Sequence, residues 1–225
     1  GAFSSQGFTS SLVLQASPEF RFKPATRIEN ACATGSAAVH QGIDFIEAGR
    51  GKVALVVGVE KMTDIDNKSV GEALLTASYL KEEAGVQGGF AGVFGQITQA
   101  YFQKYGDQSD ALAHIAAKNH KNGVENPFAQ IRKDLGFGFC RNVSEKNPIV
   151  SGPLKRTDCS LVSDGAAAIV LTNVDTAFGC QKAVAIRARA HVNDFLPMSK
   201  RNVIEFEGCS RAWALALASA GLTLD

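Results

Sequence analysis

Residues 53–59 read V-A-L-V-V-G-V, an apolar run without interruption. Such a run, rich in β-branched residues, is typical of a strand that is covered on both faces, as in the parallel sheet of an α/β protein. A second run of this kind, A-A-I-V-L at residues 167–171, follows the turn signal S-D-G at residues 163–165. We therefore expect an α/β fold in which both runs are buried strands.

Helical signals lie on the flanks of these strands. Val39, Ile43 and Ile46 recur at helical spacing, and Gly49 stands where a C-cap glycine belongs, which predicts a helix over about residues 33–48. Shorter signals predict short strands at residues 25–29 and 183–188 and a last helix over about residues 209–220.

Residues 61–163 differ in character from the strands that bracket them. They are richer in glycine and polar residues, and an excursion of this length between two strands is too long for a loop. We expect an inserted subdomain here, with a flexible glycine-rich stretch at residues 85–92. Asp107 and Ser109 are placed to cap a helix that runs to about Asn122.

Composition narrows the functional classes. The 225 residues are 45% hydrophobic and 20% charged, which does not fit a disordered chain. The sequence has 23 basic and 22 acidic side chains, so its net charge is only +1 and we expect no nucleic-acid partner. No apolar run is long enough to span a bilayer, so no membrane partner is expected either.

Five cysteines, at positions 32, 140, 159, 180 and 209, form no C-x-x-C pair. This pattern fits neither a disulfide framework nor a zinc site, and it predicts reduced thiols in a cytoplasmic protein. We expect the four cysteines after Cys32 to be packing residues.

Cys32 is the sharpest candidate for chemistry. It lies in the stretch E-N-A-C-A-T-G-S at residues 29–36, among small residues, where a predicted strand turns into a predicted helix. A helix N-terminus carries partial positive charge and unpaired N–H groups, which favour a thiolate and are suited to hold an oxyanion. Position alone leaves two interpretations open, a nucleophile or a small packing residue.

Three motifs resemble the thiolase family, in the order and spacing of that family. They are E-N-A-C-A-T-G-S-A-A-V at residues 29–39, the stretch Y-G-D-Q to E-N-P at residues 105–127, and D-C-S-L-V-S-D-G-A-A-A-I-V-L at residues 158–171. The resemblance covers nearly the whole chain and is closest to the sterol-carrier-protein type of thiolase.

The resemblance implies an acyl-CoA acyltransferase of lipid metabolism with a layered α/β/α fold. Cys32 matches the cysteine that becomes acylated, and its backbone N–H contributes to an oxyanion hole. Ser160 falls where the family places a serine near the pantetheine arm. Coenzyme A thioesters are then substrates, the acyl group passes to coenzyme A or to an acetyl-CoA enolate, and no cofactor is bound permanently.

The resemblance also implies domain bounds and partners. Residues 1–60 and 164–180 match the N-terminal core, residues 61–163 the loop domain and residues 181–225 the start of the C-terminal core. A homodimer or tetramer is expected, because the family pairs edge strands across a two-fold axis. An OB-fold partner protein is known for some members of the sterol-carrier-protein type.

The family's remaining acid–base motifs are absent from these 225 residues: Asn-Glu-Ala-Phe or His-Asp-Cys-Phe, Gly-His-Pro, and the second cysteine in Cys-x-Gly. We therefore expect the chain to be a fragment, shortened at both ends. Two alternatives stay open, a ketoacyl-synthase relative and a non-catalytic thiolase-like binding or scaffold subunit.

Weaker signals have plain interpretations. Between residues 117 and 157 eight lysines and arginines stand against three acids, which indicates either a site for coenzyme A phosphates or a solvated surface. His40 is eight residues from Cys32 along one helix and is expected to be structural. His114 and His120 do not share a helix face, so no metal site is predicted.

Overall fold

The computed structural model describes residues 3–224 and divides them into two compact units. Unit 1 comprises residues 3–64, 164–194 and 207–224, and unit 2 comprises residues 65–163 and 195–206. No helix within residues 3–224 is long and apolar enough to cross a bilayer.

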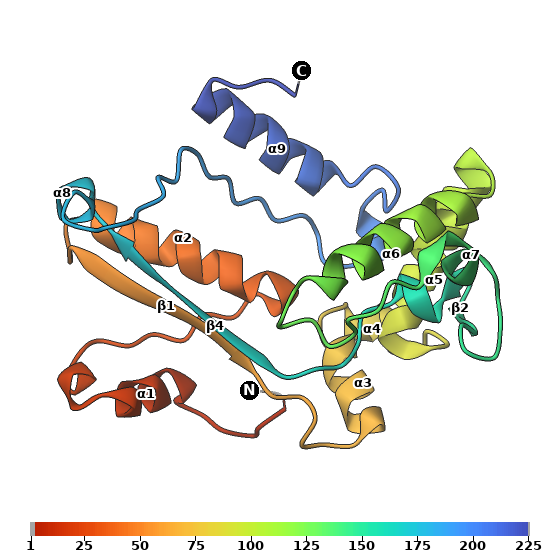
Figure 1. Ribbon diagram of the computed structural model, residues 1–225, viewed down its shortest axis with the longest axis horizontal. Coiled ribbons are helices and arrows are strands. Elements are labelled where there is room, and N and C mark those ends of the chain that lie inside the picture. The colour runs from red at the N-terminus through yellow and green to blue at the C-terminus, as the bar shows by residue number, and fades with distance from the viewer. Residues whose placement is uncertain (1–2, 225) are drawn as a thin grey trace. The chain divides into compact units, whose positions relative to one another are not determined.

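Unit 1 is built around a two-stranded sheet and one long helix. Its helices and strands are α1 (Thr9–Val13), α2 (Thr34–Glu47), β1 (Val53–Glu60), β4 (Gly165–Thr172), α8 (Val174–Ala177) and α9 (Glu207–Ala220). β1 pairs with β4 in an antiparallel ladder from Val53 opposite Thr172 to Glu60 opposite Gly165. In Figure 1 the two strands run side by side with α2 along one face of the pair.

A glycine sets the distance between α2 and the sheet. A Cβ added to Gly42 would lie 2.8 Å from Leu171 Cδ1 and 3.2 Å from Val56 Cγ2, so the helix backbone approaches the sheet closely. Within α2 only Ala37 is fully buried, which leaves the helix covered mainly by the sheet.

The expectation of parallel strands covered on both faces is wrong for β1 and β4. The chain leaves β1 at Glu60 and re-enters β4 at Gly165, directly opposite, so β4 has to run back along β1. The face away from α2 is open, since Val59 and Val170 are each 66% exposed. The mixed helices and strands still place the chain in the α/β class.

Two of the predicted strands do not form, whereas the predicted helices do. Residues 25–29 and 183–188 carry no regular structure, because neither segment has a strand beside it among residues 3–224 with which to share hydrogen bonds. Where local periodicity was the signal, the prediction is confirmed: α2 and α9 match, and Gly49 (φ 67°) and Gly221 (φ 63°) follow them in the left-handed conformation.

Unit 2 is mainly helical. Its helices and strands are α3 (Asn67–Leu75), α4 (Leu80–Glu83), α5 (Gly89–Tyr105), α6 (Ser109–Val124), α7 (Gly136–Arg141), β2 (Ile149–Ser151) and β3 (Leu154–Lys155). α6 and α7 pack together around Ala113, Ala116 and Cys140, which are fully or almost fully buried. Asp107 lies just before α6, where its carboxylate accepts a hydrogen bond from Ser109 N.

Two glycines in and just after the stretch predicted to be flexible, residues 85–92, allow close packing. Gly92 lies in α5, where an added Cβ would clash with Gln87 O. A Cβ on Gly95 would lie 2.6 Å from Ser151 Oγ, so β2 approaches α5 at this point. A Cβ on Gly85 or Gly89 would meet nothing within 4 Å, so close approach explains only part of the glycine pattern.

Asn147 ties unit 2 together as a fully buried hydrogen-bonding hub. Its Nδ2 donates to Phe139 O (3.0 Å) and Asn142 O (3.2 Å), and its Oδ1 accepts from Thr157 N (3.0 Å). One amide side chain therefore joins the end of α7 to the turn that follows β3.

Residues 195–206 form a strap that returns to unit 2 late in the chain. The buried Glu83 accepts hydrogen bonds from Tyr79 N (3.0 Å) and from Met198 N (2.9 Å) of the strap. Lys104 on α5 pairs with Glu205 at 2.5 Å. Carboxylates on both sides therefore fasten the strap along its length.

Candidate functional site

Cys32 lies in a one-turn 3₁₀ segment, Ala31–Ala33, that leads directly into α2 at Thr34. The residue before the cysteine, Ala31, has φ 46°, in the left-handed region that a residue with a Cβ seldom adopts. The side chain of Cys32 is exposed. The thiol is therefore presented to solvent from a tight, strained turn at the start of a helix.

A network of local hydrogen bonds holds this turn. Glu29 Oε1 accepts from Ala31 N (2.7 Å), and Asn30 O accepts from Ala33 N (3.0 Å). Thr34 Oγ1 accepts from Asn30 N (2.8 Å) and donates to Ala31 O (2.6 Å). A left-handed alanine costs on the order of 1–3 kcal/mol, so a network of this kind is needed to keep it.

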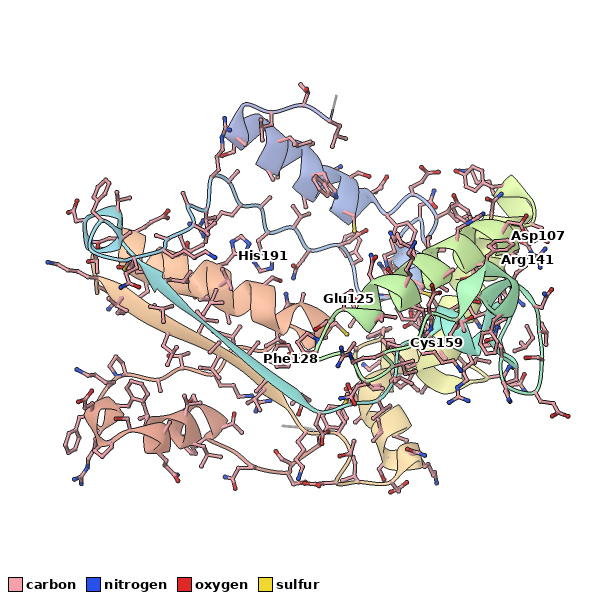
Figure 2. All side chains as sticks on the ribbon, viewed as in Figure 1. Asp107, Glu125, Phe128, Arg141, Cys159 and His191 are labelled. Atoms are coloured by element: carbon pink, nitrogen blue, oxygen red, sulfur yellow. The ribbon has the colours of Figure 1, made fainter. Side chains whose placement is uncertain are left out.

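The coil after α8 runs along α2 and is fixed to it by two side chains. Arg189 pairs with Asp44 (2.6 Å) and Glu47 (2.7 Å), and these carboxylates raise the pKa of the guanidinium further above its ordinary value. The ring of His191 lies 5.3 Å from the ring of His40, centre to centre. In Figure 2 the labelled His191 points from this coil toward α2.

His191 also reaches the cysteine turn. Its Nε2 lies 3.5 Å from Asn30 Nδ2, two residues before Cys32. His40 contacts His191 and Arg189 rather than the thiol turn. Sequence reasoning missed Asn30 and His191, and no local signal marks the pair, because 161 positions separate them.

Ser160, the second predicted site residue, is exposed and lies between β3 and β4. It belongs to unit 2, whereas Cys32 belongs to unit 1. A shared role of the two residues therefore stays a prediction.

The other cysteines fall into two groups, and only one group matches the expectation of packing residues. Cys140 is fully buried and Cys159 is partly buried, and burial together with the nearby charge of Asp158 raises the pKa of both thiols. Cys180 and Cys209 are exposed, so the expectation is wrong for them. They lie just after the short α8 and in the first turn of α9, where no core forms around them.

The basic residues predicted for phosphate binding do not form one exposed set. Lys155 is buried and pairs with the buried Asp158 (Nζ to Oδ2, 2.9 Å). Arg132 donates to Val124 O, and Arg141 pairs with Asp110. Lys155 is therefore part of the core of unit 2, and at most the remaining basic residues are available to an anion.

Unit 2 also contains an apolar cavity of about 290 Å³ between α5 and α6. Tyr101, Leu112, Ile115 and Phe206 are among its lining residues, so it offers no cation for a phosphate. Across residues 3–224 the His, Cys, Asp and Glu side chains form no group of three or more that is suited to hold a metal ion.

Comparison with known proteins identifies the class. Residues 9–135 match the thiolase N-terminal domain, so the chain belongs to the thiolase family. This confirms the resemblance carried by the motif around Cys32.

Individual relatives agree with this class. An acetyl-CoA acetyltransferase of Methanothermobacter thermautotrophicus is 31% identical over 89% of this chain and 51% of its own length. Rabbit (Oryctolagus cuniculus) sterol carrier protein 2 is 30% identical over 82% of this chain and 35% of its own length. A benzoylsuccinyl-CoA thiolase subunit of Thauera aromatica is 28% identical over 66% of this chain and 37% of its own length. The chain thus spans about half the length, or less, of the curated relatives that it matches.

Proposed function

We propose that the protein is a thiolase-type acyl-CoA acyltransferase in which Cys32 accepts the acyl group. The observation that carries this proposal is the exposed thiol on the strained turn that opens α2, inside the region that matches the family. A cysteine in a packing role would be buried, as Cys140 is. The turn instead exposes its sulfur and spends backbone strain to do so.

The proposed chemistry has two half-reactions. The Cys32 thiolate attacks the ketone carbon of a 3-ketoacyl-CoA, the bond between its second and third carbons breaks, and acetyl-CoA leaves after its enolate takes up a proton. The acyl group, now a thioester on Cys32, is attacked by the thiol of coenzyme A, which gives a shortened acyl-CoA and the free cysteine. In the reverse direction an acetyl-CoA enolate accepts the acyl group.

The turn supplies two elements of this chemistry. The backbone N–H of Cys32 contributes to an oxyanion hole, and the N-terminus of α2 directs its partial positive charge toward the developing anion. Coenzyme A thioesters bind as substrates rather than as resident cofactors, and Ser160 contacts the pantetheine arm. The Gly-His-Pro and Cys-x-Gly motifs that carry acid–base groups in the family are not among these 225 residues.

The finer architecture is part of the same proposal. Residues 1–60 and 164–180 form the N-terminal thiolase core, residues 61–163 the loop domain and residues 181–225 the start of a second core, in a layered α/β/α arrangement. The protein assembles as a homodimer or tetramer, and an OB-fold protein is a candidate partner.

A second candidate function is a non-catalytic binding subunit. It is favoured by the names of some relatives, sterol carrier protein 2 and, in Caenorhabditis elegans, a non-specific lipid-transfer protein-like protein. In that case the thiol turn would persist without acyl transfer.

The deciding experiment is peptide mass mapping after brief incubation of the intact protein with acetoacetyl-CoA. We expect an acetyl adduct on Cys32 that is lost in Cys32→Ala and kept in Cys180→Ala, the matched exposed cysteine of the same unit. Equal labelling of Cys32 and Cys180, or no labelling, would favour the binding subunit.

A further inference from the structure

His191 makes a long-range contact with the strained turn. The turn's other hydrogen bonds are local, made by residues 29–36 among themselves. The contact of Asn30 Nδ2 with His191 Nε2 brings in a residue from a distant coil. Anything that fixes Asn30 bears on the turn, since Asn30 N and O are both bound within it.

We propose that His191 is a positioning residue for Cys32, holding the carboxamide of Asn30 and thereby keeping the thiol turn in its strained form. As a role in acyl transfer, this inference rests on the function proposed above. The amide of Asn30 can only donate through Nδ2, so Nε2 of His191 has to be the acceptor and the imidazole carries its proton on Nδ1. The neutral ring is thus the form that positions the turn.

The surroundings of His191 are built to hold the ring in place. The ring of His40 lies 5.3 Å away in a tilted arrangement, and Arg189, two positions earlier, anchors the coil to Asp44 and Glu47. Because the ion pairs of Arg189 fasten the coil independently, removal of the imidazole of His191 tests the contact with Asn30 and not the attachment of the coil.

The test is the rate at which iodoacetamide alkylates Cys32, measured by peptide mass mapping with Cys180 as the internal reference. Near pH 8 we expect His191→Ala to lower the alkylation rate of Cys32 by about three- to tenfold. A change of this size corresponds to the loss of one neutral hydrogen bond. His191→Gln, which keeps an acceptor near the position of Nε2, should recover most of the rate. Arg187→Gln, an exposed residue on the same coil, is the matched control and should stay within about twofold of the unsubstituted protein.

A double variant separates positioning from general loosening. Asn30→Ala combined with His191→Ala should lower the alkylation rate no more than either single change, because both remove the same contact. The inference would be overturned if the two substitutions lowered the alkylation rate additively. It would also be overturned if Cys32 were alkylated as fast in His191→Ala as in the unsubstituted protein.

The same samples distinguish this inference from the proposed function. Suppose that acetoacetyl-CoA leaves no adduct on Cys32, but the substitutions at Asn30 and His191 lower its alkylation rate non-additively. His191 then positions the turn, and the proposal of acyl transfer is wrong. If the adduct forms at equal rates with and without His191, acyl transfer stands and the positioning role is wrong.

Discussion

Unit 2 has a buried core of its own, whereas unit 1 has almost none. The buried side chains of residues 3–224 lie mostly in unit 2, among them Val70, Val93, Cys140, Asn147 and Lys155, while unit 1 contributes Ala37 and Leu171. The cysteines divide in the same way, with the buried Cys140 and the partly buried Cys159 in unit 2 and the three exposed thiols in unit 1. The candidate site therefore lies in the unit that has few buried side chains.

The largest expected difference concerns ion pairs. Lys155→Met leaves the carboxylate of Asp158 buried without its cation, and breaking such a pair costs about 3–5 kcal/mol of the free energy of unfolding. Arg189→Met breaks exposed pairs in unit 1 and should cost less than about 1 kcal/mol. Urea unfolding curves of the two variants measure the contrast.

A double variant controls for this prediction. Lys155→Met with Asp158→Leu removes both charges, so most of the stability should return. If Lys155→Met alone is no worse than Arg189→Met, unit 2 is not the better-packed unit.

Glycine packing gives the next largest contrast. A Cβ in Gly92→Ala meets the backbone oxygen of Gln87, which cannot move aside cheaply, so we expect a loss of about 2–3 kcal/mol. In Gly42→Ala the nearest atom is the end of the Leu171 side chain, which can rotate, so a loss of about 1 kcal/mol is expected. Thermal unfolding of both variants, with Gly71→Ala as the control in open space, tests the order.

These glycines also show what sequence can reveal. Helical signals predicted α2 and α9, and continuous apolar runs predicted both strands of the ladder, since each signal lies within one element. Whether Gly92 bends or packs depends on which atoms approach it in space, and the local glycine pattern therefore suggested flexibility. The strands expected at residues 25–29 and 183–188 failed for a similar reason, because a strand needs a neighbour that no local pattern supplies.

The candidate site also has parts that the sequence predicts and parts that it does not. Cys32 could be found because its small neighbours and helix start are contiguous in sequence. The contact of Asn30, in the same turn, with His191 could not be found, because residues far apart along the chain meet only in the fold. The strain at Ala31 was equally hidden, since alanine gives no sign of a left-handed conformation.

Cysteine reactivity sharpens the comparison further. Near neutral pH we expect iodoacetamide to label Cys32, Cys180 and Cys209 at least about tenfold faster than Cys140 and Cys159, because burial raises the pKa of the latter two and hides their sulfur. Cys32 should lead the exposed group. Timed labelling with peptide mapping checks the order, and uniform rates would show that unit 2 opens as readily as unit 1.

The smallest expected effect lies at the end of the β1–β4 ladder where Glu60 is opposite Gly165. There Asp164 binds the segment that follows β1, which we call the Asp164 clasp. Asp164 Oδ1 accepts from Met62 N (2.8 Å) and Thr63 N (3.0 Å), and Oδ2 accepts from Thr63 Oγ1 (2.6 Å). The hydroxyl of Thr63 is the main cause that lowers the pKa of this carboxyl below its ordinary value.

The sign of the pH dependence follows from that lowered pKa. The folded state favours the ionised form, so the clasp stabilises the protein above the unfolded pKa of about 4 and is lost as the pH falls through the lower folded value. Asp164→Asn should therefore lower the melting temperature by about 2 °C at pH 7 and by progressively less toward pH 3. Asp175→Asn, on α8, is the control. If Asp164→Asn lowers the melting temperature by the same amount at pH 3 as at pH 7, the charge of the carboxylate is not what holds Asp164 to Met62 and Thr63.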